Sequence, residues 1–280
     1  MKIRANFIHV DSKYLYSILT SKVIIYDKKK PKKINCINIK NPSKIISDFK
    51  INSLIICTTK SDVYVFSLDK FELRYIFSLM EDSRELFYDD LSHCIYTSIL
   101  NLNNNQTELI KLDIKNSKKI ETIINKQLIL RPIQICENKL IVFCKKVGEY
   151  YNTNFYINVY DTTNLKLIDC IEKNGKLCGV SPLNSQWNYN EKDGFENIYT
   201  NKVILYKSLG LENDFYTVVK EVNNFYFLTN YKNAYILDSN FKIVKSFHEE
   251  NLENSIRDFS CFNDYFYIVK GSYLIIEKKI

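Results

Sequence analysis

The sequence has 280 residues, of which 46% are hydrophobic and 14% aromatic, with 21 Tyr and 17 Phe. This composition indicates a globular chain and favours strands over helices. The formal charge of +7, from 39 basic and 32 acidic residues, is a mild excess that allows RNA, acidic proteins or membrane surfaces as partners but requires none of them.

The sequence has no apolar run close to the ~20 residues of a membrane span. Its first residues, MKIRANFIHV, lack the apolar core of a signal peptide. We therefore expect a cytoplasmic or nuclear protein without a membrane span. The eight cysteines form no CxxC pair and mostly lie in apolar, strand-like runs, which is typical of buried, reduced thiols. The three histidines are far apart in the sequence, so we expect neither a metal site nor another cofactor.

After a first strand at Ala5–Val10, the first predicted β-hairpin is Lys13–Asp27, in which two apolar runs flank a polar turn and the second run ends in an acid. The best-defined strand pair is Asn154–Lys173, where the turn Thr162-Thr163-Asn164 follows Asp161. Further copies of the hairpin occur at Asn52–Asp69, Ser92–Asp113, Asn138–Asp161, Asn224–Asp238 and Asp264–Glu277.

The spacing of the copies indicates a repeat of about forty residues. The terminal acids are Asp27, Asp69, Asp113, Asp161, Asp238 and Glu277, with gaps of 42, 44, 48, 77 and 39 residues. The gap of 77 residues spans about two units, so we expect a degenerate copy with its third strand at Phe195–Asn201 and its fourth at Lys202–Lys207. The chain then has seven units.

Each unit is expected to have four strands, because one apolar alternation precedes each hairpin and another follows each terminal acid. The preceding strands are predicted at Ile45–Phe49, Leu86–Tyr88, Ile133–Cys136, Phe215–Val219 and Ile256–Cys261. The following strands are predicted at Ile34–Ile39, Leu73–Leu79, Lys119–Ile124, Leu165–Ile171 and Phe241–Phe247. Four antiparallel strands at this spacing predict an all-β, seven-bladed β-propeller forming a single domain over residues 1–280.

The pattern resembles a divergent WD-repeat (WD40) propeller over almost the whole chain. The residues that carry the resemblance stand where that family has Trp-Asp at the end of the third strand: Tyr26-Asp27, Leu68-Asp69, Leu112-Asp113, Tyr160-Asp161 and Leu237-Asp238. No unit has Trp-Asp itself, and the Gly-His dipeptide of the family is missing, so its structural hydrogen-bond tetrad is not assumed. Another seven-bladed family and an eight-bladed count stay open.

The last unit has three predicted strands, Ile256–Phe262, Tyr265–Lys270 and Tyr273–Lys278, and the sequence then stops. An unpaired sheet edge favours aggregation, so the last blade needs a partner strand. In one alternative Met1–Arg4 closes the ring, or the blade keeps three strands. In the other a partner protein inserts a strand, as the resemblance to WD-repeat subunits of coat and nuclear-pore scaffolds implies.

Three consecutive units have long predicted loops between their second and third strands: Asn101–Gln106, Lys145–Asn154 and Gln186–Gly194. These loops are expected side by side on one face. The candidate partner-binding residues in them are Trp187, Tyr189, Tyr150, Tyr151, Lys145 and Lys146. Aromatic side chains among polar residues are typical of protein interfaces, and with lysines they could also stack bases of single-stranded RNA. The alternative is that these loops have no function and Trp187 is a core residue.

Two further features bear on function. The basic run Lys28–Lys33 lies at the predicted turn between the third and fourth strands of the first unit, and it is either a solvated hairpin tip or a nuclear import signal. No Gly-rich phosphate loop or GxSxG elbow occurs. We therefore expect a non-catalytic protein-interaction scaffold within a larger cytosolic or nuclear complex. The alternative is an RNA-associated propeller subunit, a non-catalytic partner of an RNA-processing or RNA-modifying enzyme.

Overall fold

The computed structural model describes residues 3–79, 83–101, 106–124, 126–149, 151–211 and 215–279. The chain divides into two compact units. Unit 1 comprises Met1–Ile45, Glu191–Asp193 and Leu205–Ile280, and unit 2 comprises Ile46–Asn190 and Gly194–Ile204. The assignment of residues 1–280 to a single domain stays a prediction.

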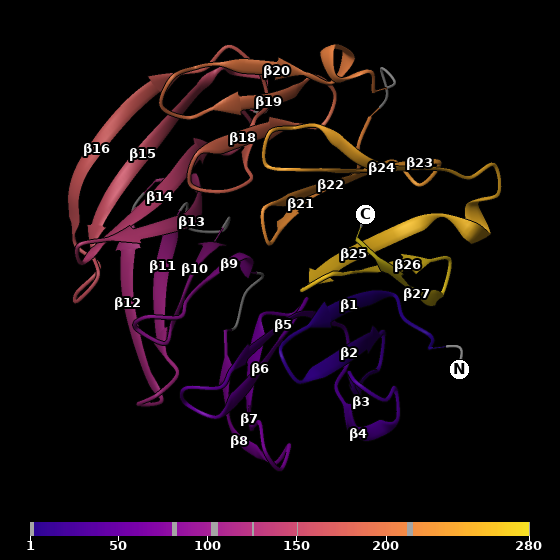
Figure 1. Ribbon diagram of the computed structural model, residues 1–280. Helices are drawn as coiled ribbons and strands as arrows, with labels where there is room; N and C mark the ends of the chain where they lie inside the picture. The colour runs from indigo at the N-terminus through magenta and orange to yellow at the C-terminus, as the bar shows by residue number, and fades with distance from the viewer. Residues whose placement is uncertain are drawn as a thin grey trace. The chain divides into compact units, whose positions relative to one another are not determined.

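Unit 1 contains three antiparallel sheets, in which consecutive strands are neighbours (Figure 1). The first blade consists of β1 (Phe7–Val10), β2 (Tyr14–Leu19), β3 (Lys22–Asp27) and β4 (Lys33–Asn38). The sixth consists of β21 (Val218–Val222), β22 (Phe225–Thr229), β23 (Asn233–Leu237) and β24 (Ile243–His248). The seventh has three strands, β25 (Ile256–Phe262), β26 (Tyr265–Lys270) and β27 (Tyr273–Lys278).

The other four sheets, each with four strands, lie in unit 2, except that Pro42–Ile45 of the second blade and Leu205 of the fifth belong to unit 1. The second blade has β5 (Pro42–Asp48), β6 (Ser53–Thr58), β7 (Asp62–Ser67) and β8 (Leu73–Ser78), and the third has β9 (Ser83–Asp89), β10 (Cys94–Asn101), β11 (Gln106–Asp113) and β12 (Lys118–Ile124). The fourth has β13 (Leu128–Cys136), β14 (Lys139–Lys146), β15 (Asn154–Asp161) and β16 (Leu167–Asn174), and the fifth has β17 (Ser181–Pro182), β18 (Trp187–Asn190), β19 (Gly194–Asn197) and β20 (Val203–Leu205).

The blade count and strand number predicted from the sequence are confirmed, including the incomplete last blade. The helices among the described residues are two short 3₁₀ turns, η1 (Tyr206–Leu209) and η2 (Leu252–Asn254). None of the described helices has the length and apolar character to cross a membrane.

Five of the six acids at the ends of the third strands accept N–H groups of the following turn: Asp27, Asp69, Asp113, Asp161 and Asp238. Glu277 instead lies within β27 and pairs with Lys245. Asp161 Oδ1 accepts the N–H groups of Thr163 (2.7 Å) and Asn164 (3.2 Å), which closes the turn into β16. In the degenerate fifth blade Asn197 takes the same position and accepts the N–H groups of Tyr199 (3.1 Å) and Thr200 (3.0 Å). The amide of Asn197 therefore replaces the carboxylate, since an Asx turn needs only an acceptor oxygen.

The core of each unit lies between its sheets, where buried side chains of neighbouring blades form shared clusters. In β6 the four consecutive residues Leu54, Ile55, Ile56 and Cys57 are all fully buried. Outer strands such as β8 and β16 are mostly exposed. All eight cysteines are free thiols: Cys57, Cys94, Cys144 and Cys261 are buried as predicted, Cys36 is partly buried, and Cys136, Cys170 and Cys178 are exposed, against the prediction.

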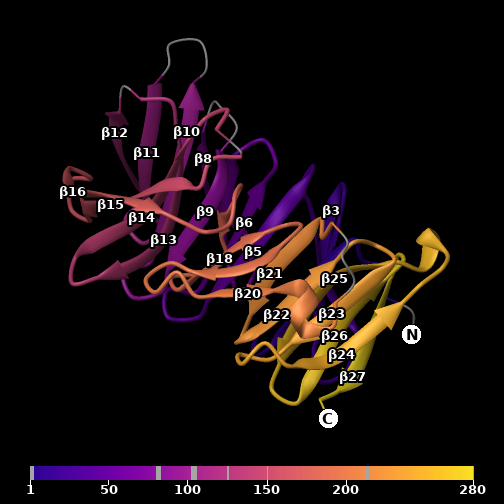
Figure 2. The ribbon, with the colours of Figure 1, turned by 90° about the horizontal axis from the view of Figure 1, so that it is seen from above.

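The N-terminal segment pairs with the last blade within unit 1. The N–H of Leu274 donates to the carbonyl of Ile3 (2.9 Å), and the N–H of Ala5 donates to the carbonyl of Ser272 (3.0 Å). Arg4 forms an antiparallel bridge with Tyr273, and the first described residues run beside β27 in Figure 1 and Figure 2. Ile3 is 4% exposed and Ala5 is completely buried. At the first part of β27 the neighbouring segment is therefore the chain's own Ile3–Ala5. This pairing favours the alternative in which the N-terminal residues complete the last blade over the one in which a partner protein inserts a strand.

Candidate functional site

The structure places the described residues of the predicted partner-binding face in different surroundings. Residues 102–105 of the first predicted loop, and Tyr150 of the second, lie outside the described residues. Tyr151 is 90% exposed in the turn before β15, where the prediction placed it. Whether it contacts a partner stays a prediction.

Trp187 and Tyr189 are strand residues, so their prediction as loop residues was wrong. Both belong to β18, and the turn between β18 and β19 is Glu191–Asp193. The N–H of Trp187 donates to Asn184 Oδ1 (2.8 Å), and its carbonyl accepts the N–H of Leu183 (2.8 Å), which closes the turn from β17. Trp187 is therefore half-buried at the end of the fifth blade opposite to the turn between second and third strands.

The two predicted lysines differ in their surroundings. Lys145 was expected on the surface but is only 6% exposed. Its Nζ donates to the carbonyl of Asn152 (2.8 Å) and so stabilises the turn between β14 and β15. Burial lowers the pKa of Lys145. Lys146 has a 53% exposed side chain, and its Nζ lies 3.8 Å from Glu149 Oε1. Lys146 is thus available to a ligand, whereas Lys145 is a structural residue.

The basic run Lys28–Lys33 lies in the β3–β4 turn, as the hairpin-tip interpretation predicted. Asp27 Oδ1 accepts the N–H groups of Lys29 (2.8 Å) and Lys30 (2.9 Å). The Nζ of Lys28 donates to the carbonyl of Asp11 (2.7 Å) and lies 3.4 Å from the centroid of the Phe262 ring. The first lysine of the run therefore contributes to the structure of unit 1.

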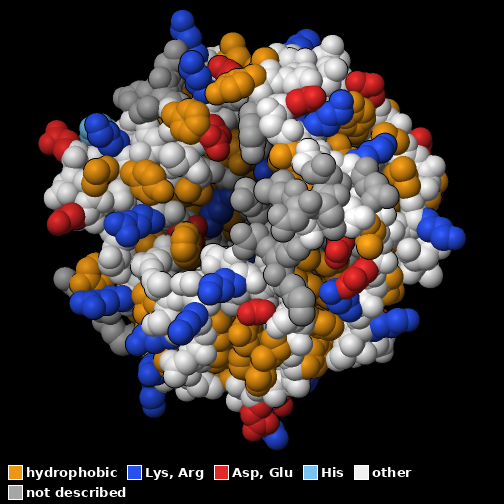
Figure 3. Space-filling model, turned by 180° about the vertical axis from the view of Figure 1, so that it is seen from behind, with side chains coloured by type: hydrophobic (Ala, Val, Ile, Leu, Met, Phe, Trp, Pro, Cys, Tyr) orange, Lys and Arg blue, Asp and Glu red, His pale blue; other side chains and the backbone are white. Residues whose placement is uncertain are grey.

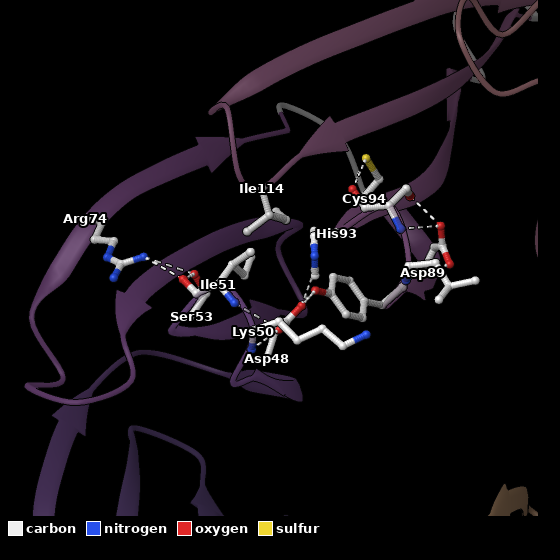
Figure 4. Close-up of polar contacts among 12 residues, drawn as sticks. Asp48, Lys50, Ile51, Ser53, Arg74, Asp89, His93, Cys94 and Ile114 are labelled. Atoms are coloured by element: carbon white, nitrogen blue, oxygen red, sulfur yellow. Dashed lines mark hydrogen bonds and ion pairs between the residues drawn. The ribbon is translucent and has the colours of Figure 1, made fainter.

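The sequence analysis missed a buried His–Asp–Tyr cluster in unit 2 (Figure 4). Asp48, at the end of β5, is 6% exposed. Its carboxylate accepts hydrogen bonds from the N–H groups of Lys50 (2.8 Å) and Ile51 (3.3 Å), from the Tyr88 hydroxyl and from His93 Nδ1 (2.6 Å). Because an ionised carboxylate only accepts, His93 carries its proton on Nδ1. The first two donors belong to the second blade and the last two to the third.

Electrostatics indicate a structural role for this cluster. Burial acts to raise the pKa of Asp48, but the hydrogen bonds from Tyr88, His93 and the two N–H groups outweigh it and lower that pKa below its usual value. Burial, together with the Asp48 charge, raises the pKa of Tyr88. The Asp48 carboxylate is thus ionised, accepts four hydrogen bonds and links the second blade to the third. The sequence contains a sign of this aspartate, which is its recurrence at the end of the first strand in other units. Asp11 and Asp89 hold the same position and also accept N–H groups of the next turn.

A second buried cluster lies on the first strands of unit 1. Asp258 on β25 is 4% exposed; its Oδ2 accepts the N–H of Ile8 (2.8 Å) and its Oδ1 pairs with Lys220 Nζ on β21. Burial is the main cause that lowers the pKa of the neighbouring His9 to about 4, because it outweighs the opposing charge of Asp11. His9 is therefore neutral near neutral pH. Among the described residues, no group of three or more His, Cys, Asp or Glu side chains could hold a metal ion.

Exposed hydrophobic side chains occur in small groups among charged ones on the face shown in Figure 3. In unit 1, exposed hydrophobic side chains also surround a cavity of about 460 Å³, which we call the Phe7 pocket. It is lined by Phe7 (48% exposed), Tyr231 (42%) and Leu252 (59%), with Arg257 beside them. These residues come from β1, the β22–β23 turn, η2 and β25.

In unit 2 a groove of about 670 Å³ runs between β12 of the third blade and β15–β16 of the fourth, which we call the seam groove. Ile123 (58% exposed) and Leu167 (51%) stand at its walls, and Leu165 and Tyr160 lie in its floor, each 1% exposed. Figure 1 shows β12 and β16 as the outer strands of their blades. Sequence analysis could not find either cavity, because each combines residues from separate repeats.

Comparisons with known proteins support the fold. No family model and no curated protein matches the sequence. Among solved structures, the chain is similar to the β-propeller domain of Cps50 (Swd1) from Myceliophteria thermophila, with a TM-score of 0.67, 9% identity and 99% of both chains covered. It is also similar to BamB from Moraxella catarrhalis (TM-score 0.57, 11% identity, 99% and 98% covered) and to the computationally designed Ika8 protein (0.62, 9%, 98% and 96%). At these identities the likeness establishes a β-propeller fold, whereas the WD-repeat resemblance stays a prediction.

Proposed function

We propose that this β-propeller is a non-catalytic protein-interaction subunit of a larger cytosolic or nuclear assembly, and that unit 1 binds a partner protein at the Phe7 pocket. The observation that carries the proposal is the convergence of three exposed hydrophobic side chains and one arginine on a single cavity. Aromatic residues and arginine dominate the binding energy of protein interfaces, because they bury a large area when they enter a partner's surface.

The backbone at Tyr231 supports this proposal. Tyr231 has a φ of 74°, in the left-handed region that disfavours bulky residues. The comparable turn between β26 and β27 has Gly271, with a φ of 59°. A tyrosine at such a position costs about 1–2 kcal/mol relative to relaxed backbone. The buried Leu165 (φ 57°) and Phe241 (φ 62°) share this conformation, so Tyr231 differs from them in that its side chain is exposed at the pocket.

The test is quantitative mass spectrometry of proteins recovered by the purified, tagged chain. The Tyr231→Gly and Leu252→Asp variants should lose specific partners that the wild type retains. Tyr265→Ser is the matched control, since Tyr265 is 45% exposed on β26 and lies outside the pocket. Recovery of the same proteins by the wild type and both pocket variants, with thermal unfolding unchanged, would contradict the proposal.

Salt dependence separates this function from the RNA-associated alternative. An interface built from Phe7, Tyr231 and Leu252 predicts weak dependence on salt concentration, because apolar contacts are not screened. RNA binding predicts a steep, linear fall of log affinity with log salt, as counterions are released. Binding of single-stranded RNA with a steep slope, and no protein partner, would favour the alternative.

A further inference from the structure

We propose that the seam groove is a second binding site, in unit 2, for an extended peptide segment in which apolar side chains are flanked by Asp or Glu. The site is distinct from the Phe7 pocket and does not depend on it. The groove's volume of about 670 Å³ lies within the range of ligand sites, roughly 300–1,000 Å³.

The groove is held in shape by contacts between its two blades. Lys111 Nζ on β11 donates to the carbonyl of Thr162 (2.8 Å), and Ser98 Oγ on β10 donates to the carbonyl of Leu130 (2.6 Å). The floor belongs to a core cluster shared by the third and fourth blades. A ligand therefore enters a pre-organised site, which lowers the entropy lost on binding.

The walls favour apolar side chains of an extended segment. Tyr156, Asn158 and Tyr160 alternate along β15 and so face the same side, towards the groove. From Tyr156 to Tyr160 a strand extends about 13 Å, which matches an extended segment of about four residues. Ile123 and Leu167 are more than half exposed, and a bound apolar side chain would remove them from water.

The charges at the groove favour acidic flanks. Three lysines line it, Lys126, Lys146 and Lys166, and the described lining residues include no Asp or Glu. Lys126 and Lys166 are exposed, and Lys146 Nζ lies 3.8 Å from Glu149 Oε1. Carboxylates of a ligand would complement these ammonium groups, whereas a basic segment would be repelled.

A buried acceptor favours a peptide over an acyl chain. Asn158 is 4% exposed; its Nδ2 donates to the Tyr160 hydroxyl (3.1 Å), and its Oδ1 has no hydrogen-bond partner. A buried carbonyl without a donor is unfavourable by about 1–3 kcal/mol. A peptide supplies N–H donors that a hydrocarbon chain lacks, so the amide at the floor of the groove selects for it.

The experiment selects peptides from a phage-displayed library of random 12-residue sequences against the purified full chain. Selected peptides, labelled with fluorescein, are then titrated by fluorescence anisotropy. We expect enrichment of two apolar residues at alternate positions flanked by Asp or Glu. Leu167→Asp should weaken their binding roughly tenfold or more, as for a central interface residue.

Neighbouring residues provide the controls. Ile168 is 53% exposed and directly follows Leu167 on β16, but it is not among the residues that line the groove, so Ile168→Asp should change affinity by less than about twofold. Lys126→Glu should weaken binding, whereas Lys115→Glu, in the exposed β11–β12 turn, should not. Thermal unfolding of each variant shows whether the fold is intact.

Three outcomes would overturn the proposal. The first is no enrichment of acidic–apolar peptides, and the second is an equal loss of affinity in the Leu167→Asp and Ile168→Asp variants. The third is that a 12-nucleotide oligouridylate or dodecanoate binds more tightly than the selected peptides and loses its binding in Leu167→Asp. The last outcome would assign the groove to RNA or to lipid. Partner binding at the Phe7 pocket is tested with other variants, Tyr231→Gly and Leu252→Asp. Each proposal can therefore fail without the other.

Discussion

Replacing Asp48 by alanine tests whether the buried carboxylate joins the second and third blades. The change removes the acceptor for two turn N–H groups, which costs about 1 kcal/mol by analogy with the loss of a helix cap. It also leaves the Tyr88 hydroxyl and His93 Nδ1 without their acceptor, at about 1 kcal/mol or more each. We expect a total destabilisation of about 3–4 kcal/mol, or a fall in Tm of roughly 6–8 °C for a chain of this size.

The assay is thermal unfolding by circular dichroism and calorimetry, with Asp113→Ala as the matched control. Asp113 accepts the N–H of Asn116 (3.0 Å) and its Nδ2 (2.9 Å) in an exposed turn, so its loss should cost less than about 1 kcal/mol. Equal falls in Tm for the two variants would refute the reasoning. In addition, Asp48→Ala and His93→Ala should be non-additive, because each removes the same hydrogen bond.

The Asp48 contribution also has a defined pH dependence. The pKa of this carboxyl is lower in the folded than in the unfolded chain. As pH falls, the unfolded chain therefore takes up the proton first, and stability is lost below about pH 4. The difference in Tm between wild type and Asp48→Ala should thus shrink as the solution is acidified through that range.

Three further predictions follow from buried groups. Burial lowers the pKa of His9 to about 4, so between pH 6.5 and 4 the unfolded chain binds a proton that the folded chain does not. As pH falls through that range, the free energy of unfolding should therefore decrease by up to about 3 kcal/mol. In urea titrations at several pH values the His9→Gln variant should lose this pH dependence, and an unchanged dependence would contradict the prediction. Asn188 is completely buried with neither amide atom hydrogen-bonded, so Asn188→Leu should raise stability by about 1–2 kcal/mol; a fall in Tm would show that the amide has a partner. Ile3→Asp places a charge in the core of unit 1 and should destabilise by about 3 kcal/mol or more, whereas Phe7→Asp at a 48% exposed position should not.

The repeat made most of the fold predictable. Asp161 marked the end of a third strand because a turn needs an acceptor there, and the outer hairpin of the fourth blade runs close to the predicted bounds. Similar arguments located the other hairpins. Alternation and turn chemistry are local, so a single sequence contains them in full.

The fifth blade was the exception, for local reasons. Its first strand, β17, has two residues and contains Pro182, and β18 reads Trp-Asn-Tyr-Asn with the buried Asn188. Neither segment shows the apolar alternation that indicates a strand. A polar strand between two turns therefore appeared as one long loop, and Trp187 was assigned to the surface of that loop.

The candidate sites depended on contacts between repeats, which periodicity does not reveal. Asp48 and His93 are 45 residues apart and meet only because the second and third blades pack together. Ile123 and Leu167 face each other across a seam between blades. Lys145 is a different case: its charge suggested the surface, but the turn back to Asn152 buries it.

The pairing of Ile3–Ala5 with Ser272–Leu274 has a consequence for biosynthesis. Residues about 270 positions apart must meet, so Ile3–Ala5 has no partner until the last blade leaves the ribosome. At roughly 5–20 residues per second this delay is about 15–50 s. During it, the apolar Ile3 and the edge of β1 are exposed to chaperones and to neighbouring chains. The completion of unit 1 is therefore expected to be slow, because closing so long a loop precedes the contacts that stabilise it.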